Sequence, residues 1–213
     1  MIDAERAADG RILSIPYCQQ RKNDYCGAAA LEMVFRYYRP SKLTKFNQDR
    51  IFRTLAKREP MGSGSYRING DDLIETARKR GFCAGWGRVH PNLRALRAQT
   101  VEIVVNRGIP LIACQRFTNA RPELGHFRVI VGVAADYVVV HDPHPEFGGA
   151  AQKWSWEKIS DYWRYTGLNV TGGVAIWVAP EPLPDNLLCP GAPNPWPELS
   201  GTPHLHFSRN PTT

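Results

Sequence analysis

The feature of this sequence that most constrains its fold is a change of hydrophobic period near residue 109. Before that point, apolar residues recur at helical spacing in Tyr25–Tyr38. Two further helices are predicted over Asp71–Arg80 and Asn92–Arg107, which end at Gly81 and Gly108. Beyond that point, segments rich in Val and Ile are typical of strands: Ile109–Arg116, His126–Val133, Tyr137–Asp142 and Gly173–Ala179. Because helices come first and consecutive strands follow, we predict an α+β fold with an antiparallel sheet rather than alternating βαβ units.

The composition changes after Ala179, where proline begins to recur at short intervals. Proline lacks the backbone N–H that regular structure needs. We therefore predict a folded domain over residues 1–179 and a proline-rich C-terminal extension over residues 180–213, and we expect a chain truncated after Ala179 to fold.

The charge of the chain gives little indication of its partners. Its net charge is +7, from 27 basic and 20 acidic residues, and the Lys and Arg are scattered, with the densest stretch at Lys42–Arg58. No nucleic-acid motif or aromatic–basic interleaving accompanies them. We interpret the charge as a solvated surface and expect no nucleic-acid partner.

Location is predicted from the absence of apolar runs. No run approaches the roughly 20 residues that span a bilayer. Residues 1–10 include Asp3, Glu5, Arg6 and Asp9 where a signal peptide needs an apolar stretch. We expect a cytoplasmic protein with no membrane partner, although secretion by a signal-free route would leave the same pattern.

The chain contains five cysteines: Cys18, Cys26, Cys83, Cys114 and Cys189. An odd number cannot pair completely, and the spacings match neither a zinc site nor a small disulfide scaffold. We expect Cys83 and Cys114 to be core residues of strand-like segments. At least one thiol is left to explain.

Histidines outside the main motifs give only weak metal patterns. His141 and His144 flank Asp142 but lack cysteine or carboxylate partners at ligand spacing, so we expect surface roles for them. His204 and His206 lie in the C-terminal extension. We predict no metal and no cofactor.

Cys26 stands at the start of the first predicted helix. A thiol there lies at the positive end of the helix dipole, which favours the thiolate and predicts a lowered pKa. Acyl transfer through a thiolate also needs a base and a donor for the developing oxyanion. Gln20 is placed to supply an amide donor beside the sulfur, with the Cys26 backbone N–H as a second donor, and Gln19 competes for this role.

A base and its orienting group follow far along the chain. His126 stands at the head of one predicted strand, and Asp142 ends the next one before Pro143. If these strands pair as neighbours, both residues fall at the same sheet edge. A carboxylate there can accept from one imidazole nitrogen and leave the other facing the sulfur.

These features resemble the papain-like cysteine peptidases, and within them the bacteriocin-processing peptidases that cut after double-glycine leaders, with their stand-alone relatives. The matching features occur in the family's order: Gln20 with Cys26-Gly-Ala, Gly125-His126-Phe, and the hairpin from Gly132 to Asp142-Pro143. The resemblance spans the chain from Ile15 to Val178.

The resemblance implies a papain-like fold, in which an N-terminal catalytic helix packs on an antiparallel sheet. It implies that Cys26 attacks the substrate, that His126 acts as base and acid, and that Asp142 orients His126. In the family, the glutamine at the position of Gln20 contributes to the oxyanion hole.

The expected function is that of a cysteine peptidase that cleaves a peptide or protein substrate through a thioester acyl-enzyme. The same triad serves acyl or peptidyl transfer, and a catalytically inactive domain that binds peptides is a further alternative. The substrate sequence and the oligomeric state cannot be read from these residues.

Overall fold

One antiparallel sheet organises the protein. The computed structural model describes residues 10–39, 47–55, 59–60, 66–165 and 173–183. The strands of the main sheet run in the order β4-β9-β5-β6-β7-β8, and β1 pairs with β6 to make seven. Their bounds are β1 Arg11–Ile12, β4 Cys83–Arg88, β5 Leu111–Thr118, β6 Arg121–Val133, β7 Tyr137–Asp142, β8 Gly149–Ser155 and β9 Val174–Ala179. A separate antiparallel pair joins β2, Glu59–Pro60, to β3, Tyr66–Arg67.

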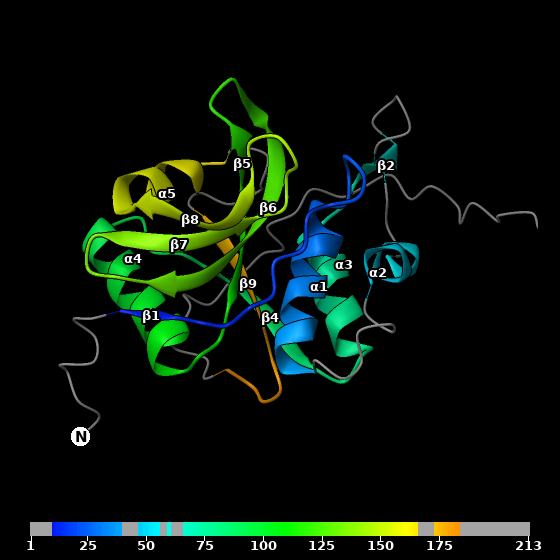
Figure 1. Ribbon diagram of the computed structural model, residues 1–213, viewed down its shortest axis with the longest axis horizontal. Coiled ribbons are helices and arrows are strands. Elements are labelled where there is room, and N and C mark those ends of the chain that lie inside the picture. Colours follow the sequence, from blue (N-terminus) through cyan, green and yellow to red (C-terminus); the bar gives the residue numbers. More distant parts are fainter. Residues whose placement is uncertain (1–9, 40–46, 56–58, 61–65, 166–172, 184–213) are drawn as a thin grey trace, which may run out of the picture.

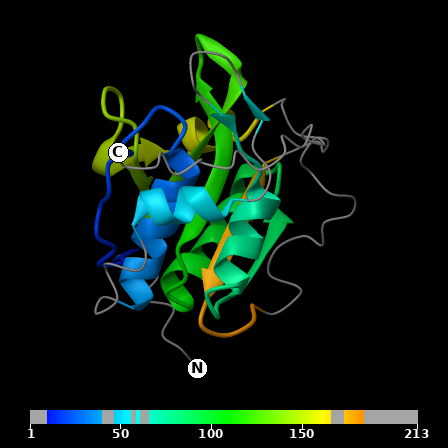
Figure 2. The same cartoon turned by 90° about the vertical axis from the view of Figure 1, so that its right-hand side faces the viewer.

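The helices flank this sheet on two sides, as Figure 1 shows, with α1, α2 and α3 on one side and α4 and α5 on the other. Their bounds are α1 Cys26–Tyr38, α2 Gln48–Thr54, α3 Gly70–Arg78, α4 Leu93–Thr100 and α5 Trp156–Tyr162. A π-helical segment, Val101–Asn106, continues α4. In both Figure 1 and Figure 2 the tip of the β5–β6 hairpin projects beyond the rest of the sheet.

The predicted helices and strands are present and form the expected antiparallel sheet, but β4 lies between α3 and α4, and several elements were missed, among them α2 and β8. Helix α2 lies in a stretch that is polar and basic overall, but its Ile51 and Phe52 are buried. Strand β8 is the edge strand beside β7, with mostly exposed or half-exposed residues, so it carries no strong apolar pattern.

The central strand β6 is apolar without interruption over Val129–Val131 because it is covered on both faces. Val129, Ile130 and Val131 are all fully buried, so both faces of this strand are covered. On one side β6 packs against α1, the helix that begins at Cys26. The core therefore holds the start of α1 beside the strand that carries His126.

The C-terminal boundary of the domain stays a proposal, because residues 184–213 lie outside the described residues. Within the described part, Leu183 is only 6% exposed and packs in the core beyond the end of β9. We propose that the folded domain reaches Leu183, and that the extension begins after it.

Truncation tests this boundary. A chain that ends at Leu183 should unfold in urea with a free energy about 1–3 kcal/mol higher than one that ends at Ala179, because the shorter chain loses the buried Leu183 side chain. The control is Leu183→Ala in the full chain, which should lose a similar amount. Equal stability of the two truncated chains would contradict the proposal.

Candidate active site

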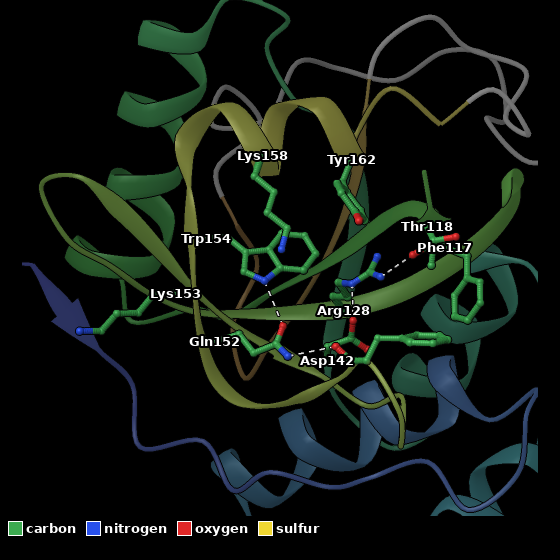
Figure 3. Close-up of a pocket in the computed structure, with 10 residues that line it drawn as sticks. Phe117, Thr118, Arg128, Asp142, Gln152, Lys153, Trp154, Lys158 and Tyr162 are labelled. Atoms are coloured by element: carbon green, nitrogen blue, oxygen red, sulfur yellow. Dashed lines mark hydrogen bonds and ion pairs between the residues drawn. The ribbon is translucent and has the colours of Figure 1, made fainter. Parts of the chain in front are cut away.

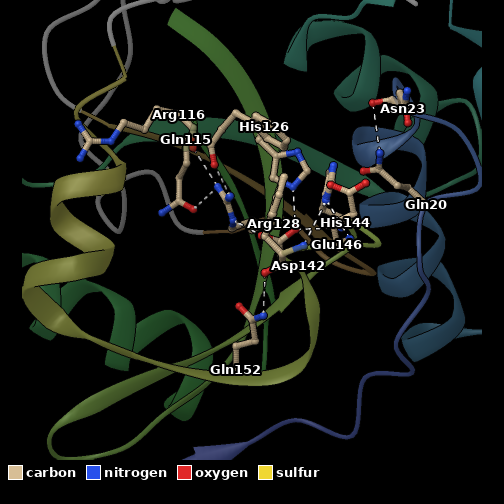
Figure 4. Close-up of polar contacts among 12 residues, drawn as sticks. Gln20, Asn23, Gln115, Arg116, His126, Arg128, Asp142, His144, Glu146 and Gln152 are labelled. Atoms are coloured by element: carbon tan, nitrogen blue, oxygen red, sulfur yellow. Dashed lines mark hydrogen bonds and ion pairs between the residues drawn. The ribbon is translucent and has the colours of Figure 1, made fainter. Parts of the chain in front are cut away.

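The candidate site forms where β6 and β7 lie side by side. Residues 126 and 128 point to the same face of β6 because side chains alternate along a strand. The pairing of Val129 with His141 sets Asp142 opposite Arg128. In Figure 4 the side chains of His126 and Arg128 accordingly converge on Asp142.

The carboxylate of Asp142 is divided between these two partners. Its Oδ1 lies 2.7 Å from His126 Nε2 and 3.0 Å from the backbone N of His144, and its Oδ2 lies 2.6 Å from Arg128 Nε. Burial alone would raise the pKa of Asp142. The hydrogen bond and charge of His126 and the charge of Arg128 outweigh burial and hold this pKa well below its usual value. Asp142 is therefore an ionised, fully paired acceptor.

The ionisation of Asp142 fixes the tautomer of His126. An ionised carboxylate can only accept hydrogen bonds, so His126 Nε2 must carry the proton. Nδ1, on the other side of the ring, is then free to accept one. Burial, followed by the charge of Arg128, lowers the pKa of His126 to about 4, although Asp142 opposes this shift. At neutral pH the ring is a neutral base with Nδ1 as its acceptor.

Arg128 was not identified as a site residue from the sequence. Its side chain is buried, donates to the backbone oxygens of Arg116 at 3.0 Å and Phe117 at 2.7 Å, and lies 5.0 Å from the ring centre of Trp154 and 5.2 Å from that of Tyr162. The available signal was its position two residues after His126, which puts it on the same face of the strand. The sequence does not give the pairing register of β6 and β7, so the position of Arg128 alone does not reveal that its partner is Asp142.

Cys26 is the first residue of α1 and is 9% exposed. The backbone N–H groups of Phe127 and Gly27 and the charges of Asp142 and Arg128 all influence the pKa of its thiol. Close packing holds this helix start in place, since a Cβ on Gly27 would come within 2.7 Å of Ile68 Cδ1. The structure thus brings the predicted nucleophile next to the strand residue that follows His126.

The predicted low pKa of the Cys26 thiol is wrong for this state of the protein. Burial raises the pKa to about 11, although backbone N–H groups of Phe127 and Gly27 act in the opposite direction. The helix start favours the thiolate, as expected, but removal of the thiol from water has the larger effect. Cys26 and His126 are therefore both neutral in the resting state.

Gln20 is buried and Gln19 is exposed, so only Gln20 is enclosed near the site. The backbone N–H of Gln20 donates to the oxygen of Pro143 at 2.8 Å, which ties it to the end of β7. Its side-chain Nε2 donates to the oxygens of Lys22 at 3.0 Å and Asn23 at 3.2 Å (Figure 4). In this state the amide serves the loop before α1, and its oxyanion role stays a prediction.

The first turn of α1 offers other donors. Its N-cap residue, Tyr25, makes no side-chain capping bond, and the first backbone bond of the helix runs from Ala29 to Tyr25. The N–H groups of Cys26, Gly27 and Ala28 therefore have no partner within the helix. They are positioned where negative charge beside the sulfur would be stabilised.

The flanking histidines differ from expectation in one respect. His141 is buried rather than on the surface: its Nδ1 accepts from the N–H of Ala151 at 2.9 Å, and its Nε2 lies 2.9 Å from the oxygen of Ile15. His144 stacks on Phe147 with ring centres 4.2 Å apart. Among the described residues, no group of three or more side chains is arranged to hold a metal ion.

The described helices include none that is long and apolar enough to cross a membrane. This finding covers only the segments that the structure describes.

Comparison with known proteins gives a consistent result. A family model described as "Peptidase_C39 like family" matches residues 12–170. No curated protein matches the chain. Among solved structures, the chain is similar to a double glycine motif protease from an AMS/PCAT transporter in complex with the leader peptide, at 21% identity over 80% of this chain and 94% of that chain, with a TM-score of 0.50.

A second solved structure, the peptidase domain of Streptococcus ComA, is similar at 19% identity over 78% of this chain and all (100%) of that chain, with a TM-score of 0.54. At these identities the likeness concerns the fold. It confirms the predicted α+β, papain-like architecture with an N-terminal helix packed on an antiparallel sheet.

The protonation state of His126 is directly testable. We expect its ring to carry hydrogen on Nε2 and to stay neutral down to about pH 5, because burial and Arg128 disfavour the imidazolium. The measurement is a long-range ¹H–¹⁵N NMR titration of the histidine rings, with His126→Asn to assign the signal. A His126 ring that is protonated at pH 7 would contradict this description.

The same shift predicts how stability depends on pH. The pKa of His126 is lower in the folded chain than in the unfolded one, so between about pH 6.5 and 4 the unfolded chain binds the extra proton. The unfolding free energy should therefore fall as pH falls through this range. The fall should be smaller in His126→Asn, and identical slopes for the two proteins would argue against a buried neutral ring.

The contribution of Arg128 can be measured against a neighbouring arginine. Arg128→Met should lower the unfolding free energy by about 3 kcal/mol, because it leaves the buried Asp142 carboxylate without its cationic partner. Arg116→Met is the control, since its partner Asp161 is 44% exposed, and it should cost at most about 1 kcal/mol. Equal losses in urea unfolding would show that Arg128 is not specially coupled to Asp142.

Proposed function

The chain belongs to the Peptidase_C39-like family, and we propose that it is a cysteine peptidase in which Cys26 attacks, His126 moves the proton and Asp142 holds His126. The observation that carries this proposal is the hydrogen bond between His126 Nε2 and Asp142 Oδ1, at 2.7 Å. This bond leaves Nδ1 as the free acceptor of the ring. The next residue, Phe127, has a backbone N–H that influences the pKa of the Cys26 thiol.

The reaction begins from the neutral pair. The Cys26 thiol gives its proton to His126 Nδ1 as the sulfur attacks the substrate carbonyl, and Asp142 stabilises the imidazolium that forms. The imidazolium then protonates the leaving amine, which releases the first product and leaves a thioester on Cys26. His126 next takes a proton from water, the hydroxide attacks the thioester, and the acid leaves as the thiol is restored.

The oxyanion of each tetrahedral intermediate needs donors beside the sulfur. The proposed donors are backbone N–H groups in the first turn of α1, which have no partner within the helix. Gln20 supplies a further donor only when its amide turns away from the oxygens of Lys22 and Asn23. We propose that substrate binding brings about this turn.

A polypeptide is the proposed substrate. The similar protease from an AMS/PCAT transporter was solved with a leader peptide bound, which supports a peptide ligand for this chain as well. The proposed function includes no metal, no cofactor and no nucleic acid.

A second candidate is a domain that binds peptides without cleaving them. The observation in its favour is the buried Cys26 thiol with its raised pKa, together with the Gln20 amide engaged in the loop.

Acyl transfer to an amine uses the same residues as hydrolysis. Product analysis with and without an added amine separates those two reactions.

The test uses a peptide library prepared from a whole proteome, because no substrate sequence is needed. The full chain should generate new peptide termini that mass spectrometry detects, and Cys26→Ala and His126→Ala should generate none above background. Cys114→Ala is the control, since Cys114 is a buried thiol in β5 that plays no part in the proposal. Identical termini from the native chain and Cys26→Ala would rule out the proposed peptidase.

Gln20 has a matched control in its neighbour. Gln20→Ala should lower turnover of a cleaved peptide by about 100-fold or more, because one oxyanion donor is lost. Gln19→Ala should leave turnover unchanged, since that side chain is exposed. Circular dichroism should show both variants folded. An unchanged rate in Gln20→Ala would assign the oxyanion hole to backbone donors alone.

A further inference from the structure

A cavity of about 430 Å³ opens beside Asp142, between β8, α5 and the β5–β6 hairpin. Figure 3 shows its lining. Arg128 and Asp142 line it together with four aromatic side chains: Phe117, Phe147, Trp154 and Tyr162. The proposed peptidase chemistry uses none of these aromatic residues.

The charges around this cavity do not balance. The charge of Arg128 is matched by Asp142, but Lys158 adds a second cation, with Nζ 4.0 Å from the ring centre of Trp154. Among the described residues, no carboxylate lies within ion-pair distance of Lys158. Burial, followed by the charge of Arg128, lowers the pKa of Lys158, although the charge of Asp142 opposes this shift.

Lys153 is a useful contrast on the same strand as Trp154. It belongs to the cavity lining, but its Nζ lies 4.8 Å from the ring centre of Tyr137, and in Figure 3 its side chain extends away from Lys158. The excess positive charge inside the cavity therefore comes from Lys158.

We infer that this cavity binds a carboxylate group, with Lys158 as the charged ligand and the aromatic side chains as walls. An anion there would pair with the Lys158 ammonium through a charge-assisted hydrogen bond beside the aromatic walls. The guanidinium of Arg128, held in place by the oxygens of Arg116 and Phe117, offsets the repulsion that the Asp142 carboxylate would exert on an anion in this cavity.

The position of the cavity suggests where such a carboxylate comes from. The ring of Phe117 lies 5.3 Å from the ring of His126 and also lines the cavity. A polypeptide held over His126 would therefore pass close to the cavity, and an acidic side chain could enter it. This source rests on the proposed function, whereas a free small carboxylate does not.

The first experiment measures binding of a carboxylate directly, in a variant chosen so that no substrate is cleaved. The full chain with Cys26→Ser is titrated with benzoate and with benzamide, which has a similar shape but no charge. Because Trp154 Nε1 donates to Gln152 Oε1 at 3.0 Å within the cavity, the indole N–H resonance of Trp154 is the readout. Benzoate should shift this signal, and benzamide should bind at least about fivefold more weakly.

Two lysine variants make the test specific. Lys158→Gln should weaken benzoate binding by about fivefold or more, because the charged ligand is gone. Lys153→Gln should change it by less than about twofold, as expected for a screened charge that points elsewhere. Lys158 is exposed, so its replacement should leave the fold intact. Equal binding of benzoate and benzamide, or equal effects of the two variants, would overturn the inference.

The second experiment identifies the source of the carboxylate. Pools of peptides that carry Glu or Gln at each position in turn are tested for displacement of benzoate from the Cys26→Ser chain. Displacement by one Glu pool but not its Gln counterpart supports an acidic side chain. Benzoate binding with no Glu preference supports a free carboxylate ligand. Both outcomes are independent of cleavage, so failure of the proposed peptidase activity would not be confused with failure of this inference.

Discussion

The arrangement of the site depends on the buried carboxylate of Asp142, which is shared between His126 and Arg128. Burying a charge costs several kcal/mol unless its partners are close and well oriented. Here every oxygen of the carboxylate has a partner within 3.0 Å, and Arg128 is itself held by two backbone oxygens. Strands β6 and β7 supply the carboxylate and its two side-chain partners, β5 supplies the two oxygens, and the segment after β7 supplies the His144 N–H. Sheet register and ion pairing therefore support each other.

This arrangement determines the protonation of the site. A cation beside Asp142 keeps the carboxylate ionised but also opposes a second positive charge on His126. The ring is therefore held as a neutral base, and the buried Cys26 thiol keeps its proton. In the proposed mechanism, proton transfer coincides with attack on the substrate, and the ionised Asp142 stabilises the imidazolium that forms. A resting site of this kind limits unwanted reactions of the thiol.

The sequence predicted the fold and the residues of the candidate site better than it predicted the pKa values of those residues. The spacing of apolar residues predicted α1 and the strands that carry His126 and Asp142, because these elements are buried and their patterns are strong. Strand β8 and helix α2 were missed because edge strands and short helices bury few side chains. Arg128 was missed because its partner is set by register, and the thiol pKa was misjudged because burial depends on tertiary packing that no local motif encodes.

The most direct test of the proposed mechanism is whether His126 activates Cys26 for acyl transfer. The full chain is mixed with p-nitrophenyl acetate, quenched at short times and analysed by mass spectrometry at each of Cys18, Cys26, Cys83, Cys114 and Cys189. The proposed mechanism predicts a hydroxylamine-sensitive acetyl thioester at Cys26 alone, formed about 100-fold more slowly in His126→Ala. Acetylation spread over several cysteines, at a rate that does not depend on His126, would contradict it.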